Sequence, residues 1–200
     1  MIYTALVPVK SLSIAKSRMA PYLSPSQRET LVLDMLYHVL HVLQDSELLE
    51  RITVVSADER VLEHAYQWGA QALLEEQQGH NPALEVAALR EKAAGVTKLL
   101  TISADLPFLS TQEIRFLFKQ SVQHEVVLAS SKEGTGTNAI LVRPPLAVPY
   151  VFGPNSLLRF MEAARQRQLS YRIYNSNGLA LDIDSIDDLR AFEILSRAAG

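Results

Sequence analysis

Three aspartates have the type and spacing expected of a divalent metal site. Asp182 and Asp184 alternate with apolar residues in a Leu-Asp-Ile-Asp segment. In an extended segment, side chains two residues apart point the same way, so these two carboxylates would share one face. Asp105 follows the apolar run of residues 99–104, as a carboxylate just beyond a buried parallel strand would. Carboxylate oxygens suit Mg2+, so these residues could hold one or two ions against phosphates.

A second candidate segment, residues 8–19, follows the first expected strand. It carries three cations, Lys10, Lys16 and Arg18, together with three serines. Such side chains donate hydrogen bonds to a triphosphate and compensate its charge. The segment contains no glycine, so it is neither a Walker loop nor a dinucleotide-binding fingerprint, and side chains would have to form the phosphate site. Taken alone, the segment also fits a solvated basic turn.

Two further segments could bind an anion through their backbone. Residues 134–138 form a Gly-Thr-Gly-Thr-Asn loop between two expected strands, and residues 152–156, Phe-Gly-Pro-Asn-Ser, lead into an expected helix. Glycines let backbone amides approach an anion closely, and a helix start offers unpaired N–H groups and a favourable dipole. A phosphate could sit between the two segments, although each alone also fits a hairpin turn or an ordinary helix cap.

The elements that must position these groups alternate between short apolar runs and amphipathic segments. Strands are expected at residues 2–7, 52–55, 99–103, 126–129, 139–142 and 171–174. Helices are expected from Ser24 to about Leu43, from Asp58 to Gly69, from Asn81 to Gly95, and after caps at Ser110, Asn155 and Ser185. This alternation predicts an α/β fold, a three-layer sandwich around a mostly parallel sheet, which binds ligands beyond the carboxyl ends of its strands.

Size and composition favour one domain over residues 1–200. The chain has 48% hydrophobic residues and a formal net charge of -3, which allows a substantial core but gives no general basic field. We therefore expect no nucleic-acid partner, and no apolar stretch is long enough to cross a membrane. The absence of cysteine fits a reducing cytoplasm, the expected location. The helix over residues 26–43 is either a core element or the interface of a homodimer, and we expect a homodimer.

Six segments, in order, resemble the motif set of the guanylyltransferases of deazaflavin coenzyme F-420 biosynthesis. They are residues 7–10, 15–18, 103–107, 134–138, 152–156 and 181–184. The resemblance spans nearly the whole chain and implies the nucleotidyltransferase (nucleotide-diphospho-sugar transferase-like) fold, similar to the enzymes that attach GMP to molybdenum cofactor. It also implies transfer of GMP from GTP to a small phosphorylated acid, with release of pyrophosphate. The acids are phosphoenolpyruvate, 2-phospho-L-lactate and 3-phosphoglycerate.

Residue roles follow from the same resemblance. The acidic positions that would bind Mg2+ are Asp105, Asp182 and Asp184, and the basic positions that would face the triphosphate are Lys10, Lys16 and Arg18. Of these, Lys16, Arg18 and Asp105 would be catalytic. The positions that would contact the acceptor are Thr137, Gly153 and Ser156. The guanine candidates are Ser56, Asp58 and Asn81, with His80 standing in the glycine-x-asparagine turn where the family pattern has an apolar residue.

This reaction needs no general base, because an acceptor phosphomonoester already carries roughly -1.5 to -2 charge near neutral pH. Phosphoenolpyruvate is the favoured acceptor, since the Ala-, Gln- and Leu-rich, cysteine-free composition is typical of bacterial proteins. Two alternatives stay open. A metal-dependent glycosyltransferase also uses an Asp-x-Asp pair and would accept phosphate-free sugars, whereas a non-catalytic GTP-binding module would bind GTP without releasing pyrophosphate.

Overall fold

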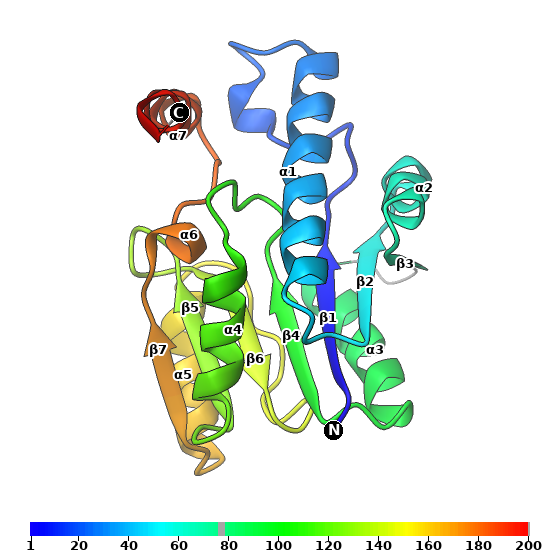
Figure 1. Cartoon of the computed structure of the whole chain (residues 1–200), viewed down its shortest axis with the longest axis vertical. Coiled ribbons are helices and arrows are strands. Elements are labelled where there is room, and N and C mark those ends of the chain that lie inside the picture. Colours follow the sequence, from blue (N-terminus) through cyan, green and yellow to red (C-terminus); the bar gives the residue numbers. More distant parts are fainter. Residues whose placement is uncertain (76–78, 200) are drawn as a thin grey trace.

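The computed structural model describes residues 1–75 and 79–199, which form a seven-stranded sheet with helices on both faces (Figure 1). The strands are β1 (Tyr3–Pro8), β2 (Arg51–Ser56), β3 (Gln71–Leu74), β4 (Lys98–Ile102), β5 (Val126–Ser130), β6 (Thr137–Val142) and β7 (Tyr171–Tyr174). The helices are η1 (Ser17–Met19), α1 (Pro25–Asp45), α2 (Glu59–Gln67), α3 (His80–Ala93), α4 (Thr111–Gln120), α5 (Ser156–Gln166), α6 (Asn177–Ala180) and α7 (Ile186–Ala199). Among the described helices, none has the length and apolar character needed to cross a membrane.

The strand order explains where a ligand can bind. The order is β3-β2-β1-β4-β6-β5-β7. β1 pairs in parallel with β2 and β4, β2 with β3, and β5 with β7, while β6 is antiparallel to both of its neighbours. The expected mostly parallel sandwich is therefore confirmed. Because the chain leaves β1 toward β2 on one side and later returns to β4 on the other, the loops after β1 and β4 meet at a topological switch point.

Two apolar layers enclose the sheet. The helices α1, α2 and α4 cover one face, where Leu36 belongs to the same cluster as Val7 of β1. The helices α3 and α5 cover the other face, where Leu84 and Phe160 belong to the same cluster as Leu6. Successive residues of β1 thus point to opposite faces, as a pleated strand requires. β4 is buried at every position, the pattern of a parallel strand covered on both sides.

The long helix α1 begins at the predicted capping box. The Ser24 hydroxyl accepts a hydrogen bond from Gln27 N, and the Gln27 side chain accepts one from Ser24 N. The apolar residues of α1, including Val39, Leu40 and Leu43, are buried against the sheet. The apolar stripe of this helix is therefore a core element, and the expected homodimer stays a prediction.

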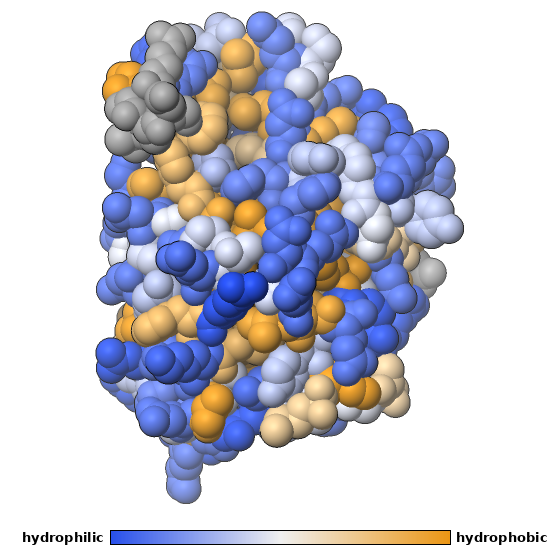
Figure 2. Space-filling model, in the orientation of Figure 1, coloured by the Kyte–Doolittle hydropathy of each residue, from blue (hydrophilic) through white to orange (hydrophobic). Residues whose placement is uncertain are grey.

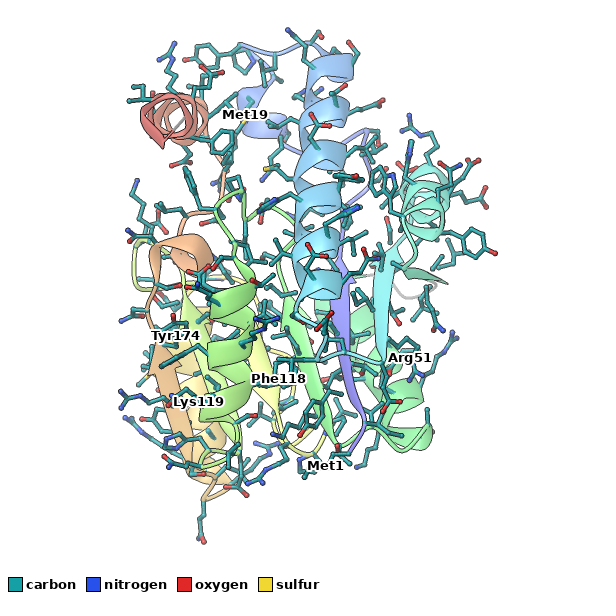
Figure 3. All side chains as sticks on the ribbon, viewed as in Figure 1. Met1, Met19, Arg51, Phe118, Lys119 and Tyr174 are labelled. Atoms are coloured by element: carbon teal, nitrogen blue, oxygen red, sulfur yellow. The ribbon has the colours of Figure 1, made fainter. Side chains whose placement is uncertain are left out.

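A third, smaller apolar cluster joins the end of the basic segment to α7. Met19 of η1, Met35 of α1 and Ile183 are its buried members, with Leu189 and Phe192 of α7 packed against them. Figure 2 shows hydrophobic residues gathered between α7 and α1 near the top of this face, and Figure 3 places Met19 there. Since Ile183 lies between two of the candidate metal ligands, this cluster ties the basic segment to the acidic one.

Candidate metal and phosphate-binding site

The three aspartates singled out in the sequence meet beyond the carboxyl end of β4. One carboxylate oxygen from each of Asp105, Asp182 and Asp184 lies within 4.8 Å of the other two. Ile183 N donates to the Asp105 carbonyl oxygen at 3.3 Å, which joins the two segments directly. Ile183 is 2% exposed while Asp184 faces solvent, although residues 181–184 are irregular and not a regular strand. Three converging carboxylates could hold a divalent cation.

Asn138 orients Asp182, a role that the sequence did not reveal. Its Nδ2 donates to the carbonyl oxygens of Leu179 and Ala180, at 3.0 and 3.3 Å, and to Asp182 Oδ1 at 3.3 Å. Asn138 is 5% exposed, so its amide depends on these partners. The available signal was an asparagine at the start of an apolar strand, where a buried amide must find hydrogen bonds.

Burial and the repulsion between neighbouring carboxylates disfavour the ionised form of Asp182. Burial raises the pKa of Asp182 to about 6, and the negative charges of Asp105 and Asp184 act in the same direction, while hydrogen bonds such as that from Asn138 oppose it. A carboxylate with this pKa holds its proton more tightly than an exposed aspartate does. A divalent cation at the cluster would favour the ionised form.

We expect binding of Mn2+ to weaken as the pH falls through about 6, because a proton then competes for Asp182. The folding stability of the metal-free protein should change in the opposite direction, because the contribution of Asp182 falls as the pH rises. A carboxyl whose pKa is raised by folding stabilises the protein below its ordinary pKa of roughly 3.9, and that contribution is lost as the pH rises through about 6. Calorimetric titration of Mn2+ between about pH 5 and 7.5 tests the first trend. Asp187→Asn, at an exposed aspartate of α7, should keep this pH dependence, and an affinity that is constant in the wild-type protein would contradict the assignment.

Lys16 lies against the carboxylates. Its Nζ is 2.6 Å from Asp105 Oδ2 and 3.1 Å from Asp184 Oδ1, and its side chain is only 8% exposed. Burial would lower the pKa of Lys16, but the two carboxylates outweigh burial and the pKa is raised, so the side chain is an ammonium. In this arrangement Lys16 supplies positive charge to the acidic cluster. Of the other two predicted cations, Arg18 NH1 lies 4.0 Å from Asp184 Oδ2, and Lys10 is exposed near the start of the basic segment.

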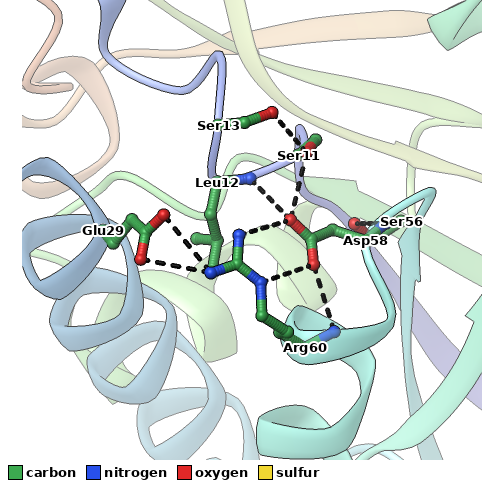
Figure 4. A network of polar contacts seen from close by, with 7 residues as sticks. All are labelled: Ser11, Leu12, Ser13, Glu29, Ser56, Asp58 and Arg60. Carbon is green, nitrogen blue, oxygen red and sulfur yellow. Dashed lines mark hydrogen bonds and ion pairs between the residues drawn. The ribbon is translucent and has the colours of Figure 1, made fainter. Parts of the chain in front are cut away.

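Asp58 holds the basic segment in place (Figure 4). Its Oδ2 accepts hydrogen bonds from Ser11 Oγ and Leu12 N, both at 3.0 Å. Both of its oxygens also accept from the Arg60 guanidinium, which reaches Glu29 of α1 as well. Burial would raise the pKa of Asp58, yet the hydrogen bonds from Leu12, Arg60 and Ser11 lower it overall. The Asp58 carboxylate therefore holds Ser11 and Leu12 of the basic segment.

The other two guanine candidates also have protein partners. Ser56 is fully buried at the end of β2, and its hydroxyl accepts a hydrogen bond from Asp58 N at 3.1 Å. The Asn81 side-chain amide bonds to the backbone of Phe152. The structure therefore brings Ser56 and Asp58 together beneath the basic segment but directs Asn81 toward the acceptor segment.

The three acceptor candidates come together where β6 and α5 begin. Ser156 Oγ donates to Thr137 Oγ1 at 3.2 Å, and both residues are buried. Gly153 has a φ of 121°, a backbone conformation that favours glycine, and its carbonyl oxygen accepts from Ser156 N. Thr137 directly precedes Asn138, whose amide contacts Asp182, so the acceptor candidates and the carboxylate cluster are connected through the first two residues of β6. The two hydroxyls and the backbone at the start of α5 could bind an anion.

A close backbone approach fixes the segment that carries Asp182. Gly178 N, in α6, donates to Glu113 Oε1 of α4 at 3.0 Å. The same glutamate accepts from Ser110 N and forms the capping box of α4. A Cβ atom on Gly178 would collide with the Glu113 carboxylate and with the Phe108 carbonyl oxygen. Glycine is therefore required here by space and not by its φ angle.

Gly178→Ala should lower the free energy of unfolding by about 1–3 kcal/mol, because the added methyl group must displace α6 or Glu113. The shift should also weaken Mn2+ binding, since α6 leads directly into Asp182. Urea unfolding and Mn2+ titration measure the two effects. Asn177→Ala, at an exposed position of the same helix, is the control and should change neither. A Gly178→Ala protein with wild-type stability would contradict the tight contact.

Comparisons with known proteins identify relatives of this chain. A sequence model of the family described as "Guanylyl transferase CofC like" matches residues 3–198. The chain is 41% identical over 185 residues to a phosphoenolpyruvate guanylyltransferase of Sphaerobacter thermophilus, covering 92% of this chain and 89% of that protein. It is 36% identical over 186 residues to a 2-phospho-L-lactate guanylyltransferase of Methanothermobacter thermautotrophicus, covering 92% and 81%.

A solved structure with a similar fold is a proposed nucleotide-diphospho-sugar transferase from Desulfovibrio desulfuricans G20. Its TM-score is 0.80 at 14% sequence identity, and the match covers 96% of this chain and 87% of that chain. At this identity the likeness concerns the fold alone, and it confirms the nucleotide-diphospho-sugar transferase-like fold expected from the sequence.

Proposed function

The chain belongs to the family of CofC-like guanylyl transferases, and from this premise we infer that it is a guanylyltransferase acting on a phosphorylated acid. The family match over residues 3–198 is the observation that carries this conclusion. The reaction transfers GMP from GTP to the acid, releases pyrophosphate and serves coenzyme F-420 biosynthesis. The convergence of Lys16 with three carboxylates at the switch point supports a catalytic site over a non-catalytic GTP-binding module.

Phosphoenolpyruvate is the acceptor that we propose. The relative named for this acid is 41% identical to the chain, compared with 36% for the relative named for 2-phospho-L-lactate. The second acid stays as the alternative, because both carry a phosphate and a carboxylate on three carbons. Thr137, Gly153 and Ser156 would bind these anionic groups through two hydroxyls and the backbone at the start of α5.

The three aspartates fit a divalent cation, for which Mg2+ is our proposal, because hard oxygen donors converge within 4.8 Å. Bound there, the cation would supply Lewis-acid stabilisation of negative charge on the phosphates. Asp105, Asp182 and Asp184 would contribute the ligand oxygens, and Asn138 would keep Asp182 oriented. In the chemical step, an acceptor phosphate oxygen forms a bond to the GTP α-phosphorus while the bond to the bridging oxygen of the β-phosphate breaks.

The basic segment would stabilise the leaving group. The Lys16 ammonium and the Arg18 guanidinium would compensate the charge that develops on pyrophosphate, and Lys10 would extend the same positive surface. Asp58 would keep this segment in position through its bonds to Ser11 and Leu12. No protein group has to remove a proton, since the attacking phosphate oxygen is already ionised near neutral pH.

Pyrophosphate release from GTP with Mg2+ tests the proposal, with phosphoenolpyruvate, 2-phospho-L-lactate and 3-phosphoglycerate supplied separately and ATP as the nucleotide control. We expect release that requires GTP and phosphoenolpyruvate. Release with another of the three acids would correct the acceptor and keep the reaction. GTP binding without release in any mixture would instead support the non-catalytic module.

A further inference from the structure

The Asn81 side chain bridges parts of the chain that are 71 residues apart. Its Nδ2 donates to the Phe152 carbonyl oxygen at 3.0 Å, and its Oδ1 accepts from Phe152 N at 2.9 Å. The orientation of the amide is determined by its partner, because a backbone N–H can only donate and a backbone carbonyl can only accept. Asn81 therefore pairs with both backbone groups of a single residue, much as a neighbouring strand would.

Phe152 depends on this contact. In the described part of the chain, its backbone N–H and carbonyl have no backbone hydrogen-bond partner. Its ring contacts His80 edge-on, with 5.5 Å between centroids, and packs against Tyr150 and Phe160 at 5.9 and 5.1 Å. Two consecutive residues at the start of α3 thus hold Phe152, one through its backbone and one through its ring.

The position of Phe152 determines how the chain enters the acceptor turn. Gly153 follows it directly, accepts from Ser156 N and leads into α5. The hydroxyl of Ser156 in turn meets Thr137 at the start of β6. A shift of Phe152 would therefore move Gly153 and Ser156, which we assign to the acceptor. The basic segment and Asp58 would keep their own contacts.

We propose that Asn81 is a positioning residue for the acceptor-binding turn of residues 152–156 and not a guanine contact. The proposal rests on the proposed function, which assigns the phosphorylated acid to this turn. The Asn81 amide is held at both of its polar atoms, by bonds of 3.0 and 2.9 Å to Phe152, and turning it toward guanine would break both bonds and leave half-buried backbone groups unpaired. Asn81 thus connects α3, on the β1–β3 side of the sheet, to the acceptor turn before α5.

Two substitutions separate this role from base recognition. Asn81→Ala removes both hydrogen bonds, and Asn81→Asp keeps an acceptor for Phe152 N while losing the donor to its carbonyl. We expect the KM for the acceptor acid to rise about 10-fold or more in both variants, because small misplacements of binding groups are costly. The Kd for GTP and the preference for GTP over ATP should stay within about 2-fold of wild type. Asn175→Asp, at an exposed position, is the control and should change none of these values.

Hydrogen exchange provides a readout that does not depend on turnover. The Phe152 amide should exchange faster in Asn81→Ala than in the wild-type protein, while amides in β1 and β4 keep their protection. Unchanged exchange at Phe152, or a loss of GTP affinity equal to the rise in acceptor KM, would overturn the proposal. If the wild-type protein released no pyrophosphate with any acid, the proposed function would fail; faster exchange at Phe152 would then still show that Asn81 holds the turn, but its acceptor role would be overturned.

Discussion

Asp182→Asn should reduce pyrophosphate release from GTP by about 10³-fold, equivalent to about 4 kcal/mol of transition-state stabilisation. The substitution keeps the shape of the side chain but replaces a charged oxygen ligand by an amide. Asp182 is the candidate ligand whose pKa is raised to about 6 by burial and by its acidic neighbours, so the neutral amide should not destabilise the fold. Asp105→Asn should have an effect of similar size, since it removes another charged oxygen from the cluster and the carboxylate that pairs with Lys16.

The matched control is Asp187→Asn, at an aspartate of the first turn of α7 whose side chain is 86% exposed. It removes the same charge near the site without touching the cluster. Steady-state turnover and Mn2+ titration should separate the variants. Asp182→Asn and Asp105→Asn should lose turnover and Mn2+ binding, whereas Asp187→Asn should keep both. Near-normal turnover in Asp182→Asn and in Asp105→Asn would contradict the metal assignment.

Lys16→Gln should lower kcat/KM by about 10²-fold and, at the same time, strengthen Mn2+ binding in the absence of nucleotide. The two effects have one cause. The Lys16 ammonium lies 2.6 Å from Asp105 and 3.1 Å from Asp184, so it neutralises the carboxylates that a cation would need. With a triphosphate bound, the ammonium would exchange these carboxylates for phosphate oxygens, and the variant would lack that charge during the reaction.

Lys119→Gln removes the same charge from an exposed position of α4, which Figure 3 places far from the basic segment, and should change neither quantity. Calorimetry with Mn2+ alone measures the first effect, and pyrophosphate release measures the second. Weaker Mn2+ binding in Lys16→Gln would contradict competition between the ammonium and the cation, even if turnover fell as expected.

The sequence was informative wherever burial leaves a pattern along the chain. β1, β4, β5 and β6 are continuous buried runs, so their approximate positions were predictable from composition alone. β3 was not predicted, because it is a four-residue edge strand whose side chains are mostly exposed. The single-turn helices η1 and α6 were missed as well, since three or four residues carry no helical periodicity.

The acidic cluster could be predicted from residue types. The contacts of nearby polar side chains could not, because their partners are distant in the sequence. Asp105 was recognisable because parallel strands end at a common edge. Nothing local to Asn81 or Asp58 indicates that each side chain contacts a loop 71 or 46 residues away. The capping glutamate Glu113 likewise shows its cap in the sequence but not its second contact with Gly178. Such contacts follow from topology, which a local pattern does not contain.

The contact between Lys16 and Asp184 also bears on the order of events during folding. These residues are 168 positions apart, so the conformational entropy lost on closing the intervening loop cannot be recovered until much of the sheet has formed. β1 can pair with β2 and β4 earlier, because those pairings span shorter loops. Cation binding would therefore be a late event in refolding, and the appearance of a Mn2+ signal would mark the moment at which the two ends of the fold have docked.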